Sequence, residues 1–199
     1  MIDKIEKKIK ILIEKRYSII DHFIIKGINK NTKLKDSGIN WIGEMSSDSE
    51  LIKLKFLVSK VGSGSTPRGG SQIYLEEGIP FLRSQNIYFE GLHLDNVVYI
   101  SDEIHDKMSN SKVLPNDVLF NITGNSIGRC YFTKHDSVEY NVNQHVCIIR
   151  PNEKIYTKYL YYCLYSRIGQ DQVVINNTGS GKEGLSSQNI KNFILPYYK

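Results

Sequence analysis

The first 26 residues show a helical pattern of apolar and polar positions. Apolar side chains recur there at alternating spacings of three and four, which is the spacing of a coiled-coil interface. Arg16 is a polar interruption within this row. We call the row the seam, and its apolar members are Ile2, Ile5, Ile9, Leu12, Ile19 and Phe23.

A second apolar strip beside the seam widens the hydrophobic face. Its members are Ile13, Tyr17, Ile20 and Ile24. Gly27 follows, and glycine is a residue that ends helices. A single helix of about 25 residues cannot bury such a face within itself. We therefore expect residues 1–27 to form a coiled-coil-like arm that packs on another helix or a partner. The alternative is a helix packed on its own globular domain.

The pattern changes twice further along the chain. Residues 28–50 are rich in Asn, Lys, Ser, Asp and Gly, which is typical of a linker, and we expect Trp41 and Ile42 to pin it to a domain. From residue 51 on, short runs rich in Val, Ile, Tyr and Phe predict strands. These runs lie within residues 55–61, 78–84, 96–101, 117–122, 128–134 and 145–151.

Three segments show helical patterns instead. They are residues 101–110, 157–174 and 186–193, the last starting with an N-cap at Ser186 or Ser187. Together these elements predict an α+β fold. We expect a mixed α/β domain over residues 51–199, preceded by the long coiled-coil-like helix and by a linker over residues 28–50.

Composition excludes several classes of protein. Apolar residues make up 40% of the chain, which is enough for a hydrophobic core. The formal net charge is +5, but residues 1–35 contribute +6 and the remainder −1. Total charge is therefore weak evidence for nucleic acid. No run approaches the roughly 20 apolar residues of a membrane span, and the N-terminus lacks the apolar core of a signal peptide.

The cysteines predict no metal site and no disulfide framework. Cys130, Cys147 and Cys163 are an odd number without a CxxC pairing. Each lies among apolar or aromatic residues, which predicts buried thiols of a cytoplasmic protein.

Catalytic motifs are also missing from the sequence. The stretch VGSGSTPRGG at residues 61–70 lacks the Lys-Ser/Thr ending of a phosphate-binding loop. We expect its glycines to let the backbone approach a partner closely. Neither a Gly-x-Ser-x-Gly elbow, nor an HExxH motif, nor a plausible carboxylate pair for a nuclease metal is present. The sequence therefore predicts a binding protein with no cofactor, no metal and no chemistry of its own.

Polar clusters follow several of the predicted strands. They are TPRGGSQ at 66–72, RSQN at 83–86, TGNS at 123–126, NVNQH at 141–145 and NNTGSGKEGLSSQN at 176–189. Such side chains serve both to hold DNA phosphates and to read base edges. Each cluster alone also fits a polar turn. The candidate DNA-binding residues are Thr66, Arg68, Arg83, Ser84, Gln85, Asn86, Asn125, Asn143, Gln144, Lys182, Ser187 and Gln188.

The order of these motifs resembles a target-recognition domain of the specificity subunit of type I DNA restriction-modification enzymes. The segment EKRYSIIDHFIIKGINKNTKLKDSGINWIGEM is similar to the end of that family's central conserved helix and its entry into the second recognition domain. GSTPRGG…YLEEGIPFLRSQNI, LPNDVLFNITGNSIGRC, NQHVCIIRP and GLSSQNIKNFILP resemble later motifs in the same order. Asn116 stands where the family commonly has glycine.

The resemblance implies a subunit that reads double-stranded DNA for a separate methyltransferase and a separate ATP-dependent nuclease. Arg83 and Ser84 match positions that the family shares across different targets, so support or phosphate contact suits them better than base reading. Gln85 and Asn86 are then the residues expected to face the bases.

The chain departs from the family in size, because it has one domain and one helix where a complete subunit has two of each. A half-subunit, a truncated product or a fragment would all fit. An unpaired seam predicts self-association through the N-terminal helix. Two other hypotheses are a non-catalytic interaction protein that docks through its helix without reading DNA well, and the recognition domain of a single-chain restriction enzyme.

Overall fold

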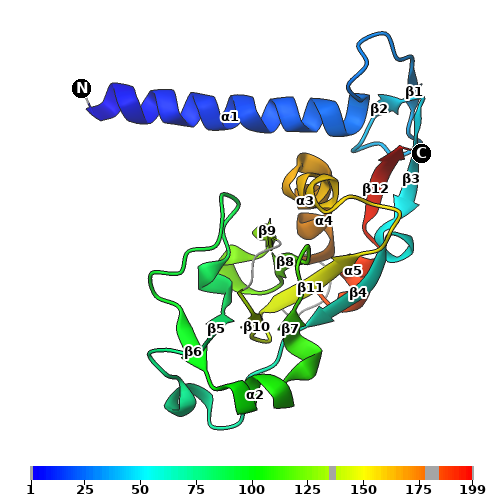
Figure 1. Cartoon of the computed structure of the whole chain (residues 1–199). Coiled ribbons are helices and arrows are strands. Elements are labelled where there is room, and N and C mark those ends of the chain that lie inside the picture. Colours follow the sequence, from blue (N-terminus) through cyan, green and yellow to red (C-terminus); the bar gives the residue numbers. More distant parts are fainter. Residues whose placement is uncertain (1, 135–137, 178–183, 199) are drawn as a thin grey trace.

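The computed structural model describes residues 2–134, 138–177 and 184–198. The long N-terminal helix is present as α1 (Ile2–Lys26), which projects from the rest of the molecule as a rod (Figure 1). It ends where Gly27 takes a positive φ of 83° and its N–H donates to the Phe23 carbonyl at 3.1 Å.

The two apolar strips of α1 have different environments. In the second strip, Tyr17 and Ile20 are partly buried and Ile24 is buried against the main core, whereas Ile13, nearer the free end of the helix, is 50% exposed. Tyr17 stacks on Tyr165 with ring centroids 4.5 Å apart. The seam, in contrast, faces outward. Between 45% and 55% of the surface of each of these seam residues is exposed: Ile5, Ile9, Leu12, Ile19 and Phe23. The side chain of Ile2 lies outside the described part.

The segment expected to be a linker carries structure of its own. Strands β1 (Leu34–Asp36) and β2 (Glu44–Ser46) form an antiparallel hairpin. Ile42 and Met45 are buried, and Trp41 packs partly against the main core, as the pinning of this segment requires.

Strand β3 connects the N-terminal part of the chain to the last strand. It spans Ser49–Lys53 and pairs antiparallel with β12 (Ile194–Tyr198). The Tyr198 hydroxyl donates to the Ile24 carbonyl at 3.3 Å, so the last strand also touches α1. The base of the helix is thereby tied to the C-terminal end of the domain.

The centre of the molecule is an antiparallel sheet in the order β4-β11-β8-β9. Its strands are β4 (Val58–Ser63), β8 (Val118–Asn121), β9 (Cys130–Phe132) and β11 (Val146–Pro151). A second sheet has the order β6-β5-β10-β7, and its β5–β10 pair is parallel. Its strands are β5 (Ile79–Leu82), β6 (Val98–Ile100), β7 (Lys112–Val113) and β10 (Tyr140–Val142).

All six predicted strands are confirmed, as β4, β5, β6, β8, β9 and β11. Strands β1, β2, β3, β7, β10 and β12 were not predicted. Four of them, β1, β2, β7 and β10, have only two or three residues, which leaves little pattern. Strands β3 and β12 have five residues each, but their apolar positions do not form a run like those of the predicted strands. Asn116, just before β8, has φ 70°, a left-handed conformation in which glycine is easily accommodated.

The predicted helical segments are also confirmed, with one difference. The stretch 157–174 forms two helices that meet at Ser166, whose hydroxyl donates to the Cys163 carbonyl at 2.8 Å. The Ser186 hydroxyl caps the last helix by accepting from the Asn189 N–H at 3.1 Å. Over the described residues, α1 is followed by the helices α2 (Asp102–Lys107), α3 (Thr157–Tyr165), α4 (Arg167–Asn177) and α5 (Ser187–Lys191). Short 3-10 turns include η1 (Leu54–Phe56), η2 (Gly70–Ile73), η3 (Ser84–Asn86), η4 (Ser109–Ser111) and η5 (Gly124–Ser126).

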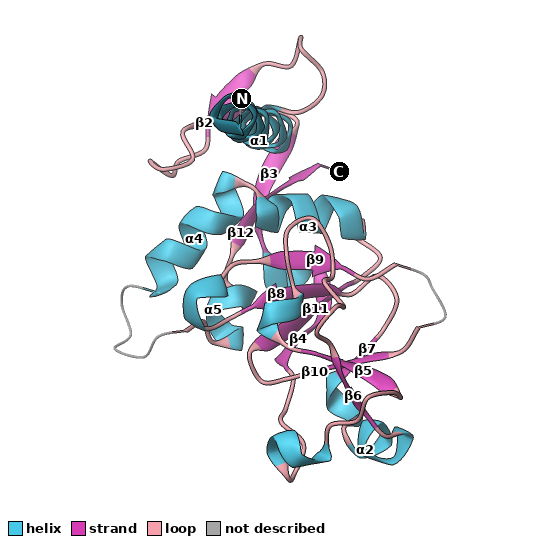
Figure 2. Ribbon diagram, turned by 90° about the vertical axis from the view of Figure 1, so that its left-hand side faces the viewer, coloured by secondary structure: helices cyan, strands magenta, loops and turns pink. Residues whose placement is uncertain are grey.

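The central sheet separates two hydrophobic cores. Alternate residues of β8 point to opposite sides, so Val118 and Phe120 enter the core under the helices while Leu119 enters the core shared with the second sheet. Figure 2 shows the central strands between the helices and the second sheet. Burial on both faces explains why β8 and β11 read as continuous apolar runs.

Candidate nucleic-acid interface

Three of the predicted polar clusters meet in one polar hollow of about 360 Å3. Their convergence follows from the strand order. Strands β5 and β10 are parallel neighbours, so the segments that follow them leave the same sheet edge. The end of β8 lies beside the start of β11, which brings in η5. The hollow is lined by Ser84, Gln85, Tyr88, Thr123, Gly124, Asn125, Ser126, Arg129 and His145.

A fourth cluster reaches the hollow through a chain of hydrogen bonds. The Thr66 hydroxyl donates to Oε1 of Gln144. The side-chain nitrogen of Gln144 lies 3.1 Å from Nε2 of His145, and Nδ1 of His145 lies 2.7 Å from the Thr123 hydroxyl. The loop before β5 and the turn before β11 are thereby linked to η5.

The glycine-rich turn approaches the chain's own backbone. A Cβ atom added to Gly64 would lie 2.0 Å from the Val142 carbonyl oxygen, closer than real Cβ contacts. The Gly64 N–H also donates to the Val146 carbonyl at 2.9 Å. The glycine there fits the turn against β10 and β11, and Thr66 is placed beside Gln144 as a result. Arg68, further along the same loop, is exposed.

Two of the candidate residues serve the fold instead of a ligand. Asn86 is only 2% exposed, and its amide accepts from the Arg83 N–H at 3.0 Å and donates to the His93 carbonyl at 2.9 Å. Asn143 is also buried, and its Oδ1 accepts from the His145 N–H at 3.1 Å. The expectation that Asn86 faces the bases is therefore corrected, because the backbone already uses both ends of its amide.

The side chain of Arg83 also makes contacts within the fold. Its guanidinium donates to the Asn96 carbonyl at 3.1 Å and lies 5.9 Å from the centre of the Tyr74 ring. Ser84 and Gln85 differ from it, because both line the hollow and Gln85 is exposed.

The remaining candidates lie apart from the hollow or outside the described residues. Ser187 and Gln188 belong to α5, which packs against β4 and η1. Lys182 lies in the segment 178–183, outside the described residues. Asn177 and Gly184 line a smaller hollow together with Asn125.

A stack of three side chains at this site was not predicted from the sequence. The Tyr88 ring stacks on His93 with centroids 4.0 Å apart and planes 17° apart. The Arg129 guanidinium lies 4.7 Å from the centre of the Tyr88 ring. Arg129 comes from the start of a predicted strand, where a single Arg gives no signal of a site. Only the pairing of β8 with β9 brings it over Tyr88.

The charge of the hollow favours an anionic ligand. Among the described residues that line it, Arg129 is the one formal cation and no Asp or Glu is present. No salt bridge involves Arg129 within the part of the chain that the structure describes. A guanidinium without a carboxylate partner attracts phosphates.

The cysteines are placed as predicted. All three are free and buried. Burial raises the pKa of the Cys147 and Cys163 thiols to about 12 and raises that of Cys130 further, so they stay protonated. Among the described residues no group of three or more His, Cys, Asp or Glu side chains could hold a metal ion. No described helix is long and apolar enough to cross a membrane.

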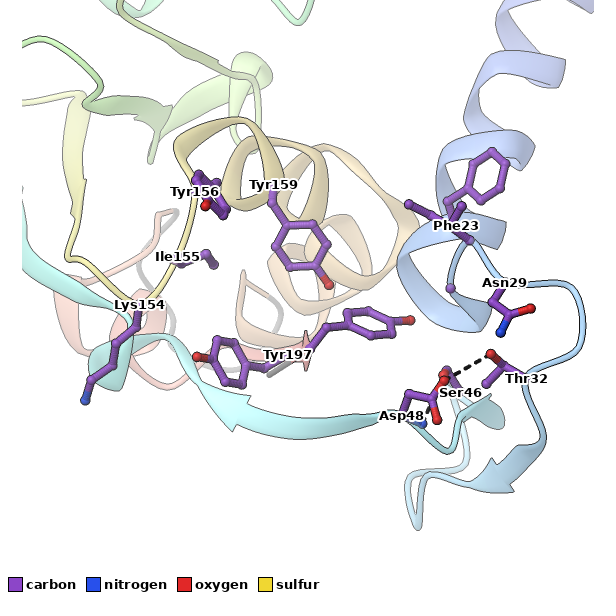
Figure 3. A pocket seen from close by; sticks show the side chains of 13 residues that line it. Phe23, Asn29, Thr32, Ser46, Asp48, Lys154, Ile155, Tyr156, Tyr159 and Tyr197 are labelled. Atoms are coloured by element: carbon purple, nitrogen blue, oxygen red, sulfur yellow. Dashed lines mark hydrogen bonds between the residues drawn. The ribbon is translucent and has the colours of Figure 1, made fainter.

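A separate apolar cavity of about 470 Å3 lies at the base of α1 (Figure 3). Phe23, Tyr159 and Tyr197 line it, and Thr32 bonds to Asp48 at its edge with an oxygen–oxygen distance of 3.0 Å. A groove of about 680 Å3 between α1 and α3 shares Phe23 and Tyr159 with the cavity and adds Leu12, Ile19 and Tyr162. The outward seam of α1 thus continues onto the domain as one apolar surface.

Comparison with known proteins places the chain in a family. The family model described as "Type I restriction modification DNA specificity domain" matches residues 46–197. Among solved structures, the HsdS subunit from Thermoanaerobacter tengcongensis is similar with a TM-score of 0.61 and 14% identity, covering 99% of this chain and 42% of that one.

Two further structures are similar. A chain from a type I R-M system, studied for complex assembly and conformational transition, has a TM-score of 0.58 and 12% identity, covering 99% of this chain and 44% of that one. The S subunit of the type I restriction-modification system from M. genitalium has a TM-score of 0.56 and 19% identity, covering 77% of this chain and 35% of that one. At these identities the likeness shows the fold, and this chain spans less than half of each related chain.

Proposed function

The chain belongs to the type I restriction modification DNA specificity domain family, and from that membership we propose that it recognises a DNA sequence for separate methyltransferase and restriction subunits. Specificity subunits of this family are non-catalytic components of the restriction-modification complex. The role proposed for this chain is therefore to bind and orient DNA, while its partners carry out methylation and cleavage. DNA as the ligand also implies a cytoplasmic location.

The convergence of polar clusters carries this proposal. Residues from after β5, after β8 and after β10 line one hollow, whose described lining includes no carboxylate, and the Thr66 loop is bonded to its edge. Gln85 and Asn125 are exposed there, and amide side chains make paired hydrogen bonds with adenine edges. We assign base reading to these two residues and positioning to Arg83 and Ser84.

Assembly through α1 is the second part of the proposal. The seam of α1 is exposed and offers an apolar face to another helix. We infer that two copies pair their α1 helices antiparallel about a two-fold axis. Two recognition domains held apart in this way would read an interrupted palindrome, because the symmetry of the protein is imposed on its site.

Selection of bound sequences from a random duplex library, with and without the methyltransferase, tests the proposal. We expect enrichment of one site made of two inverted halves. Changing Gln85 to Ala should reduce discrimination at one position by about 1–3 kcal/mol, the value of a good bidentate base contact. If the chain enriches no sequence in either condition, the proposed function is wrong.

A second candidate function rests on the apolar surface of α1. The seam, the groove beside α3 and the cavity of Figure 3 could dock restriction-modification subunits without DNA reading. This chain would then bind the methyltransferase through its seam and still enrich no sequence. Seam substitutions that abolish binding to the methyltransferase while library selection stays random would favour this candidate.

A further inference from the structure

We propose that the polar hollow is a clamp for one phosphodiester of the DNA backbone, held by Arg129, Thr123 and Ser126. This inference rests on the proposed function and deepens it, since it assigns a ligand group to the hollow and separates the hollow from base reading. A phosphate held in the hollow would place Gln85, which lines the same hollow, in a fixed position relative to the duplex.

Arg129 supplies the charge. Its guanidinium lies over Tyr88, which is itself stacked on His93, so the side chain is held by a rigid aromatic support. Within the described residues no hydrogen bond or ion pair uses its side-chain N–H groups, although its backbone N–H and carbonyl are bonded to Ser126 and Asn121. The donors of a pre-oriented guanidinium are thus available to a ligand.

Thr123 supplies a hydroxyl whose direction is set by its neighbours. The Thr66 hydroxyl donates to Oε1 of Gln144, so the Gln144 side-chain nitrogen faces Nε2 of His145 and donates to it. His145 then carries its proton on Nδ1, and that N–H donates to the Thr123 oxygen at 2.7 Å. The Thr123 hydroxyl hydrogen has no acceptor among these groups and is free to donate into the hollow.

The direction of the Ser126 hydroxyl is likewise set by a neighbour, Asn121. The Asn121 side-chain nitrogen donates to the Ser84 carbonyl at 2.8 Å, which fixes the orientation of the amide because a carbonyl can only accept. The same nitrogen donates to the Ser126 hydroxyl oxygen at 3.1 Å. Asn121 is fully buried, so it acts from behind the surface. The Ser126 hydroxyl hydrogen is therefore also left for a ligand.

Three donors and one positive charge require a ligand that accepts several hydrogen bonds and is negative. A guanine edge offers two acceptors, N7 and O6, and an arginine fork alone occupies both. A phosphodiester offers a full charge and oxygen atoms with several lone pairs, and Ser, Thr and Arg are typical phosphate ligands. The hollow therefore fits a phosphate better than a base.

The test compares full-length Arg129→Gln, Thr123→Val and Ser126→Ala with the wild type, on the selected duplex and on random duplex over a range of salt concentrations. We expect each variant to bind both duplexes more weakly by a similar factor, on the order of ten- to hundredfold for Arg129→Gln. The slope of log K against log salt should fall by about 0.9 per chain in that variant. Lys158→Gln is the matched control, because Lys158 is exposed on α3, outside the hollow, and its loss should leave the slope unchanged.

Two results would overturn the clamp. One is a changed base preference at a single position in Arg129→Gln with an unchanged salt slope, which would make Arg129 a base reader. The other is wild-type affinity and slope in all three variants with thermal midpoints like that of the wild type. Failure of the proposed function gives a different result, since the wild-type chain itself would then enrich no sequence.

Discussion

The asparagines of this chain differ in whether their side chains are buried within the fold or exposed in the hollow. Asn86, Asn121, Asn141 and Asn143 are at most 8% exposed, and each bonds to backbone groups or neighbouring side chains. Asn125, in a cluster of similar composition, is exposed in the hollow. A buried amide without partners would cost free energy, so these bonds hold the residues and leave little for DNA. The one buried amide oxygen of the four that has no partner among the described residues is Oδ1 of Asn121, and it is closed off from the surface.

His105 carries a pH dependence at this scale. Asn141 accepts from the Val142 N–H with its Oδ1, so its nitrogen donates to Nδ1 of His105 at 3.2 Å and Nε2 of His105 carries the proton that faces Glu139 at 3.3 Å. Burial, with a smaller effect of Lys112, lowers the pKa of His105 below 6.5, and Glu139, Asp106 and Asp102 oppose this only in part.

Because the folded pKa is depressed, the unfolded chain takes up the proton first. The stabilising contribution of neutral His105 is therefore present above pH 6.5 and is lost as the pH falls below it. We expect the free energy of unfolding, measured with urea between pH 5 and 8, to decrease on the acid side. His105→Gln should be less stable at pH 8 and should show a shallower decrease. Equal pH profiles for the two proteins would contradict the role assigned to His105.

At the scale of elements, α1 combines two interfaces on one helix. Its second strip packs within the chain from Tyr17 to Ile24, and Asp21 accepts from the first N–H of α4 at 2.7 Å. The helix is about 37 Å long, and its seam remains exposed over most of that length. Each apolar side chain left in water costs about 25 cal/mol per Å2 of surface, so several such residues together amount to several kcal/mol. That cost favours a partner helix.

Substitution of the seam tests self-association. We expect the wild-type chain to sediment as a dimer in analytical ultracentrifugation at tens of micromolar, and Ile9→Glu with Leu12→Glu to sediment as a monomer. The domain should stay folded, because both residues are about half exposed and outside the main core. Lys7→Glu with Lys10→Glu is the control, since these exposed positions lie off the seam. A wild-type chain that is monomeric at this concentration would refute the pairing.

The whole molecule is held together by pairs that are distant in sequence. Strand β12 pairs with β3, its Tyr198 bonds to the end of α1, and the Ile194 N–H donates to Gln172 of α4 at 2.6 Å. Leu195, in the middle of β12, is fully buried in the main core. The helix α1, the β1–β2 hairpin and the domain therefore share one core. A substitution in β12 should lower the stability of all three together.

Leu195→Ala measures this coupling. Loss of a fully buried leucine side chain leaves a cavity, so we expect the free energy of unfolding to fall by about 2–5 kcal/mol in a single urea transition. Leu34→Ala is the matched control, because Leu34 is 44% exposed on β1 and should change stability by less than about 1 kcal/mol. A loss of similar size in both variants would show that β12 does not anchor the core.

Most of the regular elements could be predicted from the sequence, because their signals are local. The seam spacing, the continuous apolar runs of β8 and β11 and the cap at Ser186 each arise within a few residues, where the apolar period and the capping residue distinguish helix from strand. The order of the motifs was also enough to indicate the family that the comparison with known proteins then showed. The sequence also marked the polar clusters that line the hollow.

Only the tertiary structure decided which polar residues form a site. The parallel pairing of β5 with β10, more than 50 residues apart in sequence, and the pairing of β8 with β9 bring Gln85, Thr123 and Arg129 into one hollow. The same packing buries Asn86 and Asn143 a residue or two from exposed neighbours. Composition cannot separate such neighbours, because burial depends on what the rest of the chain places above them. The outward direction of the seam was decided in the same way, when the domain packed against the other strip of α1.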